Sequence, residues 1–178
     1  MTSPGFISRG AAAVLIALLA TGAYADADGP LSVQIGPQFA LQDNARNAGG
    51  DTQTDIGVNY DFLKLPVVPL AASFQADDAF GSHGSGNLNQ LGFGLAGRLT
   101  TPLYAGAGIS VYSVNGRLAY TDAPSLSGSA VGENFFVGDR VFALPGGVSF
   151  NVQATYKRVP AVAGIDSSAF GVGLRVAL

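Results

Sequence analysis

Apolar residues alternate with polar or small residues, with a period of two, through most of the chain. The clearest case is VSFNVQATYK, residues 148–157, in which Val148, Phe150 and Val152 alternate with Ser149 and Asn151. Because successive side chains of a β-strand point to opposite faces, this period predicts strands with one apolar and one polar face. The same alternation occurs in seven further segments, at 31–41, 54–62, 68–76, 90–99, 103–113, 134–144 and 167–178. We therefore expect an all-β fold with eight strands.

The segment 134–144, NFFVGDRVFAL, fits the alternation less well than the others. One phase places Asp139 among the apolar residues and the other places Arg140 there. A β-bulge near Gly138 would reconcile the pattern, because a bulge inserts one extra residue into a strand. The inward phase of this sixth strand stays open at the sequence level.

The connections between the segments alternate in length. The short ones are 63–66, 100–102 and 145–147, and 159–166 is intermediate. The long ones, expected to be loops, are 42–53, 77–87 and 115–133. Short turns at one end and long loops at the other are typical of an antiparallel up-and-down meander, which can close into a barrel.

The polar face of the strands carries few charges. Charged residues are 12% of the chain, whereas about 25% is usual for soluble proteins, and the polar face is mostly Gly, Ser, Asn, Gln and Ala. Small side chains suit the interior of an eight-stranded barrel, and the apolar face then suits lipid. Closure also leaves no unpaired strand edge, which a membrane requires. We therefore predict an eight-stranded antiparallel transmembrane β-barrel with its apolar face outward.

A few charges of both signs fall on the inward face: Asp55, Asp61, Arg98, Lys157 and Arg175. Depth along the strands predicts two levels, with Asp61, Arg98 and Arg175 near the short-turn end and the other two near the long-loop end. Since unpaired buried charges are costly, each level is expected to pair opposite signs and to fill the interior. The alternative is that these charges line a narrow conduit.

The first 25 residues resemble a signal peptide. Arg9 precedes the apolar run 11–23, and Ala23-Tyr24-Ala25 matches a cleavage site. The barrel domain is then expected to span 26–178. Without Arg9, eight basic residues remain against twelve acidic ones, a net charge of −4, which argues against nucleic acid as a partner. The chain has no Cys and one His, so thiol chemistry and a His-based metal cluster are excluded.

Taken together, the signal peptide, the eight alternating segments and the terminal strand resemble the OmpA- and OmpX-type small outer-membrane barrels. The resemblance covers the whole mature chain and is one of pattern. It implies a monomer in the cell outer membrane, with outer-membrane lipid, lipopolysaccharide and the barrel-insertion machinery as partners. It also implies that the last strand is the assembly signal, through Phe170, Val172, Leu174, Val176 and Leu178. Leu178 departs from the aromatic residue that usually ends this family.

Some barrels of this kind modify lipids, so catalysis has to be considered. His83 and Ser85 lie close together, with Asp77 and Asp78 nearby, in a segment rich in Gly and Ser. A hydrolase needs such groups on a rigid support, and we expect a solvated loop tip instead. The acids of the expected loops do not have the spacing of a calcium site; they are Asp43, Asp51, Asp77, Asp78 and Asp122. No catalytic residue, cofactor or metal is therefore predicted.

The function most consistent with these features is a structural role in the envelope, or surface contact through the extracellular loops. Two alternatives remain open. One is a narrow channel for small or apolar solutes, and the other is a lipid-modifying enzyme.

Overall fold

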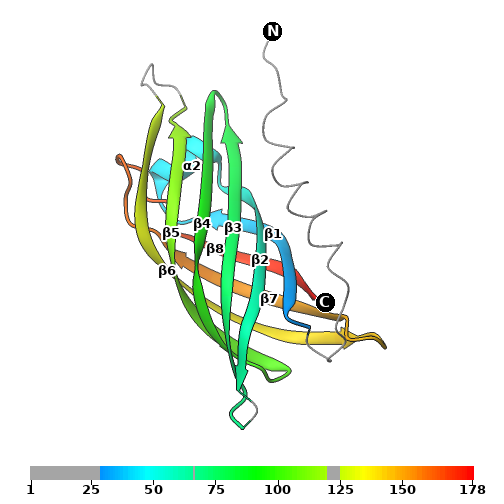
Figure 1. The fold of residues 1–178 in the computed structure, drawn as a ribbon. Coiled ribbons are helices and arrows are strands. Elements are labelled where there is room, and N and C mark those ends of the chain that lie inside the picture. The colour runs from blue at the N-terminus through cyan, green and yellow to red at the C-terminus, as the bar shows by residue number, and fades with distance from the viewer. Residues whose placement is uncertain (1–28, 66, 120–124) are drawn as a thin grey trace.

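Eight antiparallel strands form a closed barrel in the computed structural model, which describes residues 29–65, 67–119 and 125–178. Each strand pairs with the next in sequence, and β1 pairs with β8 (Figure 1). The strands are β1 (Leu31–Ala40), β2 (Thr52–Leu65), β3 (Leu70–His83), β4 (Gly86–Leu99), β5 (Leu103–Arg117), β6 (Leu126–Ala143), β7 (Ser149–Arg158) and β8 (Ala169–Ala177). The predicted all-β, eight-stranded, up-and-down barrel is confirmed. The expected signal peptide and Asp122 lie outside the described residues.

The last strand closes the barrel against the first. Leu174 is opposite Ile35 and Val176 is opposite Val33 in the β1–β8 ladder. The amide of Leu178 donates a hydrogen bond to the carbonyl of Leu31 at 2.7 Å. The segment expected to serve as the assembly signal is thus one wall of the barrel.

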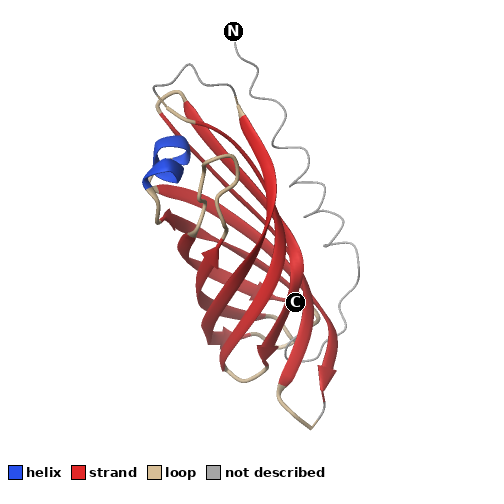
Figure 2. Cartoon of the chain, turned by 90° about the vertical axis from the view of Figure 1, so that its left-hand side faces the viewer, coloured by secondary structure: helices blue, strands red, loops and turns tan. Residues whose placement is uncertain are grey.

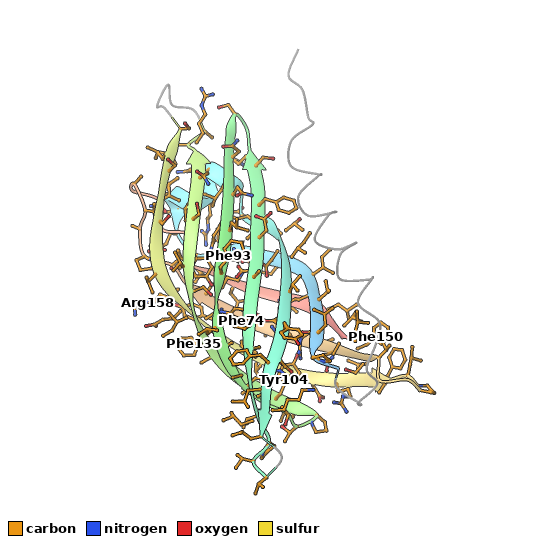
Figure 3. All side chains as sticks on the ribbon, in the orientation of Figure 1. Phe74, Phe93, Tyr104, Phe135, Phe150 and Arg158 are labelled. Carbon is orange, nitrogen blue, oxygen red and sulfur yellow. The ribbon has the colours of Figure 1, made fainter. Side chains whose placement is uncertain are left out.

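The exposed fractions of the side chains agree with the predicted faces. Leu95 is 52% exposed and Val152 is 47% exposed, whereas the neighbouring Gln153 is 5% exposed. Phenylalanines project from the outside of the wall, among them Phe74, Phe93 and Phe135 (Figure 3). The barrel is therefore apolar outside and polar inside.

The wall is taller on one side than on the other. Strands β2 to β6 have 14 to 18 residues, whereas β1, β7 and β8 have 9 or 10 (Figure 1). We call the end with the short β2–β3, β4–β5 and β6–β7 connections the turn end, and the opposite end the cap end.

Two of the expected long loops are wrong. Most of 77–87 belongs to β3 and β4, which are joined by a tight turn at Gly84 and Ser85, where Gly84 has a φ of +57°. The expected loop 115–133 is likewise shortened, because β5 continues to Arg117 and β6 begins at Leu126. Gly, Ser and Asp made these segments look like loops, but cross-strand pairing outweighs their low strand propensity.

The phase of β6 is settled by its packing. Asn134 is buried, and Gly138 faces inward, where the ring of Tyr104 occupies the space that a Cβ would need. Arg140 shares that phase, and Asp139 lies on the exposed outer face. The register shifts between Arg140 and Phe142, so the bulge lies closer to the turn end than the expected position near Gly138.

The first connection contains a short helix, α2 (Asp43–Gly49), in place of the expected polar loop. Ala45 and Ala48, three residues apart and so on one face of the helix, are both fully buried. The helix packs against the ends of β3 and β4 and lies at the cap end (Figure 2). Among the described residues, no helix is long and apolar enough to cross a membrane.

Candidate functional site in the barrel interior

The charges nearest the turn end form a buried ion pair. The guanidinium of Arg98 donates a hydrogen bond to the carboxylate of Asp61 at 2.5 Å, and their side chains are 5% and 2% exposed. Both residues lie near the turn-end limits of their strands, so alternation and topology together bring them to one depth. Breaking a pair this deeply buried would leave an uncompensated charge.

Arg175 lies at the same end but has other partners. Its Nε donates to the hydroxyl of Ser32 at 2.9 Å, and its guanidinium carbon lies 5.2 Å from the centre of the Tyr104 ring. A cation over an aromatic ring is stabilised by the negative face of that ring. Asp61 is therefore directly bonded to Arg98, whereas Arg175 contacts a hydroxyl and an aromatic ring.

The second group of charges lies nearer the cap end and has three members. Lys157 Nζ donates to Asp55 at 2.6 Å and to Asp77 at 2.5 Å, and all three side chains are almost fully buried. The structure thus joins Asp55 and Lys157, which were expected at one level. Asp77 was expected in a solvated loop, and this expectation is wrong. The missed signal is the alternation itself, which continues past Ala76 and directs Asp77 inward.

A layer of amides and hydroxyls separates the two charged groups. Gln153 donates to Gln34 at 2.6 Å and accepts from the hydroxyl of Tyr104 at 3.0 Å. Gln75 donates to Ser110 at 2.7 Å. Each bond joins two strands that have one strand between them, so these bonds add cross-links that the strand ladders do not supply.

Between these groups the interior holds a cavity of about 40 Å³. Residues of both charged groups line it, among them Asp55, Arg98, Lys157 and Arg175. Since a water molecule needs roughly 10–15 Å³ of such space, the cavity has room for about three waters. Its polar lining offers each of them several hydrogen-bond partners.

The interior changes character toward the cap end, where it is apolar. Ala45 and Ala48 of α2 pack there with side chains from the wall and from the connection between β7 and β8. The remaining buried members of this apolar cap are Ala40, Leu88, Tyr112, Val114, Val159, Val162 and Ile165. The cap was not expected, although Leu88 and Val114 follow the inward phase of β4 and β5 and could have indicated it.

The connection between β7 and β8 is held in place by its own contacts. Val162 and Ile165 exchange two backbone hydrogen bonds of 2.9 Å, and Ala163 and Gly164 between them have positive φ angles. Asn44 of α2 donates to the carbonyl of Gly164 at 2.5 Å. The two segments that cover the opening therefore bind each other.

Gln90 lies on β4 and points into the barrel, next to the apolar cap on the side of the turn end. Its side chain is 0% exposed, and neither its Nε2 nor its Oε1 has a hydrogen-bond partner. A buried amide in this state costs free energy, typically about 1–3 kcal/mol.

Of the residues considered for catalysis and for calcium, His83, Asp43 and Asp51 lie together at the cap end. His83 is the last residue of β3 and lines a surface recess with Asp43, Arg46 and Asp51. The guanidinium of Arg46 lies 3.6 Å from the carboxylate of Asp43 and 3.7 Å from that of Asp51, so both acids are already paired with Arg46. Within the described residues, no cluster of three or more His, Cys, Asp or Glu side chains could hold a metal ion.

Comparison with known proteins adds evidence on the fold. No protein-family model and no curated protein sequence matches the chain. A solved structure of Neisserial surface protein A superposes with a TM-score of 0.55 at 13% identity, covering 83% of this chain and 96% of that one. The chain has the fold of the small eight-stranded outer-membrane barrels. The N-terminal β-barrel domain of Pseudomonas aeruginosa OprF is also similar, at a TM-score of 0.47 and 10% identity, covering 82% of this chain and 93% of that one.

Proposed function

We propose that this small barrel is an integral outer-membrane protein, present as a monomer with its turn end toward the periplasm. The observation that carries the proposal is the apolar outer wall. Ile109 and Val131 are each 62% exposed and Val111 is 54% exposed, while charged and amide side chains fill the inside. Water would solvate such a wall poorly, whereas a hydrocarbon band about 25 Å tall suits it.

We further propose that the barrel does not conduct. Two groups of ion pairs, the amide layer and the apolar cap occupy successive levels of the interior. With eight strands, a barrel is only wide enough for side chains to fill it. Reconstitution into planar bilayers is the test, and the expected result is a stable inserted protein without discrete conductance steps. Steps in most insertions would favour the narrow-channel alternative.

The proposed role is therefore structural, or one of contact at the cell surface. Strands β3 to β6 extend beyond the shorter strands at the cap end, and α2 packs beside β3 and β4 there (Figure 1). A deletion strain should be compared with its parent for envelope permeability and for adhesion to surfaces. A permeability defect alone would indicate that the protein has a structural role. An adhesion defect would indicate that it functions in surface contact.

We also propose that the chain is not an enzyme. His83 shares its recess with Arg46 and with acids that Arg46 already pairs, which does not suit a general base oriented by a free carboxylate. Incubation with lipopolysaccharide should release no fatty acid. Release that His83→Ala abolishes would overturn this part of the proposal.

A further inference from the structure

The tallest strands of the wall form a sheet whose one side edge has no neighbour. The β6–β7 ladder ends with Glu133 opposite Arg158, and β6 continues toward the cap end through residues 126–132 (Figure 1). On one side these residues pair with β5. Within the described part of the chain, no strand pairs with them on the other side. We call this side of 126–132 the open edge.

Three residues direct their backbone groups toward the open edge. In an antiparallel sheet, the N–H and C=O of successive residues point alternately to the two neighbouring strands. The amide of Arg140 donates to the carbonyl of Pro102, on the β5 side, at 3.1 Å. Because the β5–β6 ladder has no register shift, the even-numbered residues of β6 face β5 along its whole length. The odd-numbered Ser127, Ser129 and Val131 therefore face the open edge.

These backbone groups have no protein partner among the described residues. None of the backbone hydrogen bonds outside the strand ladders involves Ser127, Ser129 or Val131. All three side chains are exposed, Val131 at 62%. A row of N–H donors and C=O acceptors is thus left to water, although such groups are normally paired in a folded protein.

The opposite edge of the same tall sheet is covered, which makes the contrast informative. Near the cap end of β3, the carbonyl of Gly49 in α2 occupies the space that a Cβ on Gly81 would need. Proteins usually protect a strand edge by such a cover, by charges or by proline, because a bare edge invites another strand. The segment 126–132, LSGSAVG, contains no charged residue and no Pro. The open edge therefore has none of these protections.

The open edge lies on the water side of the membrane boundary. The exposed side chains of Glu133 and Arg158 stand at its foot, with the carboxylate 3.9 Å from the guanidinium. Charges on the outer face of a transmembrane barrel are costly in the hydrocarbon and cost little near the interface. With the turn end in the periplasm, residues 126–132 are extracellular and within reach of a protein outside the cell.

The two faces of this segment indicate which side chains an added strand needs. Toward the barrel mouth, Leu126 and Ala130 pack against the apolar cap. On the outer face stand Ser127 and Ser129, which suit small polar neighbours such as Thr. An added strand would continue both faces, so its side chains should alternate between apolar and polar.

We propose that the open edge binds an extended peptide segment of a protein outside the cell, as an antiparallel strand added to β6. Main-chain hydrogen bonds supply the affinity in this mode of recognition, and alternate side chains supply the specificity. Every ladder of the barrel is antiparallel, whereas the β6 of a second copy in the same membrane would run parallel. This inference rests on the proposed surface contact and names its site and the class of its partner.

The test uses the full mature protein, folded in detergent micelles, and a capped synthetic peptide of alternating Thr and Val with Lys at each end. Amide hydrogen exchange is followed by NMR. Without peptide, the amides of Ser127, Ser129 and Val131 should exchange fast, and saturating peptide should slow them by about tenfold or more. The even-numbered amides of the segment, which bond to β5, should be protected with and without peptide.

A matched pair of variants tests the hydrogen bonds themselves. Ser129→Pro removes one open-edge donor and leaves the β5 ladder intact, since proline is tolerated where a strand N–H faces solvent. It should weaken peptide binding about tenfold, equivalent to about 1.4 kcal/mol. Ser129→Ala keeps the donor and should bind like the wild type. A peptide of the same charge, methylated on alternate backbone nitrogens, should not bind, and it tests the same bonds without altering the protein. If Ser129→Pro does not fold, Ser127→Pro replaces it.

Equal binding of the two peptides, or by the two Ser129 variants, would overturn the proposal. Slow exchange without peptide would also overturn it, because the edge would already be occupied. Slowing that grows with protein concentration would assign the edge to a second barrel, and slowing that does not would assign it to the chain's own β7–β8 connection.

The deletion strain separates this inference from the surface-contact role. If deletion abolishes adhesion and both the wild type and Ser129→Pro restore it, the surface-contact role stands and the open edge is rejected as its site. Restoration by the wild type and Ser129→Ala but not by Ser129→Pro is the expected result. Unchanged adhesion on deletion rejects the surface-contact role itself.

Discussion

Lys157 on β7 and Asp77 on β3 meet across the barrel at 2.5 Å, although 80 residues separate them in sequence. Asp55 on β2 accepts from the same ammonium at 2.6 Å. One cation thus holds two carboxylates from neighbouring strands of the opposite wall. The β2–β3 hairpin and β7 are therefore joined by a polar contact that the strand ladders do not supply.

Replacing Lys157 by Met should destabilise the barrel by about 3–5 kcal/mol, because two buried carboxylates lose their cation. Urea unfolding in lipid vesicles measures the change. It is followed by circular dichroism, because the chain has no Trp for fluorescence. Adding Asp55→Asn and Asp77→Asn should restore more than half of the loss, since this group then holds no unpaired buried charge. Lys64→Met, the same change at an exposed position of β2, is the control. A triple variant no more stable than the single one would contradict the ion-pair account.

The pair at the turn end gives a second, independent prediction. Asp61→Ala should cost about 3–5 kcal/mol if the site is dry, because Arg98 then loses its carboxylate. Arg175 should be affected less directly, because it contacts Ser32 and Tyr104 but also interacts with the charges of Asp61 and Arg98. Asp43→Ala, at a side chain that is 93% exposed, is the control. A loss no larger than that of the control would mean that water fills the lumen, and it would revive the conduit.

Much of this arrangement follows from alternation and topology alone. Asp61 and Arg98 meet because both lie on the inward phase and both lie near the turn-end limit of a strand. Asp77 was missed because its neighbours include Asp78, Gly81 and Gly84, a composition typical of loops. Local composition does not reveal that this part of β3 pairs with β4, and this pairing keeps the segment extended.

The apolar cap could not be predicted in the same way. Its helix has only seven residues, and helices this short depend on tertiary contacts for their stability. Those contacts come from Leu88, Val114 and Ile165, which are distant in sequence and meet only once the barrel has closed. A period-two pattern describes the wall and carries no information about what covers its opening.

The lipid-facing wall should not tolerate charge at Leu95, which lies between Phe74 and Ile109 in the strand ladders. We expect Leu95→Arg to cost about 2–4 kcal/mol in folding into lipid vesicles, as for arginine near a bilayer midplane. Ser127→Arg places the same side chain on an exposed position at the cap end of β6, beyond the apolar band, and should be nearly neutral. Equal losses for the two variants would argue against the proposed depth of the barrel in the membrane.

Gln90 offers a test of the interior below the cap. Its amide is fully buried without a partner, so Gln90→Leu removes an unsatisfied polar group at nearly constant volume. The variant should be more stable than the wild type by about 1–3 kcal/mol. Gln153→Leu is the opposite case, because Gln153 bonds to Gln34 and Tyr104, and it should destabilise. A destabilised Gln90→Leu would reveal an ordered water that satisfies the amide.

The final strand should govern assembly, and its contacts say which part matters. Removing 175–178 deletes the bond from Arg175 to Ser32, the bond from Leu178 to Leu31 and the last rungs of β8 against β1 and β7. Closure would then fail at the turn end, and we expect no heat-modifiable, folded band on electrophoresis. Leu178→Phe keeps every one of these backbone contacts and supplies the aromatic ending usual in similar barrels, so it should insert at least as well as the wild type. Arg175→Gln separates the two effects, because it removes the ion but retains the rungs, and it should fold with reduced stability. A truncated chain that still shows the folded band would refute a role for the last strand in both closure and assembly.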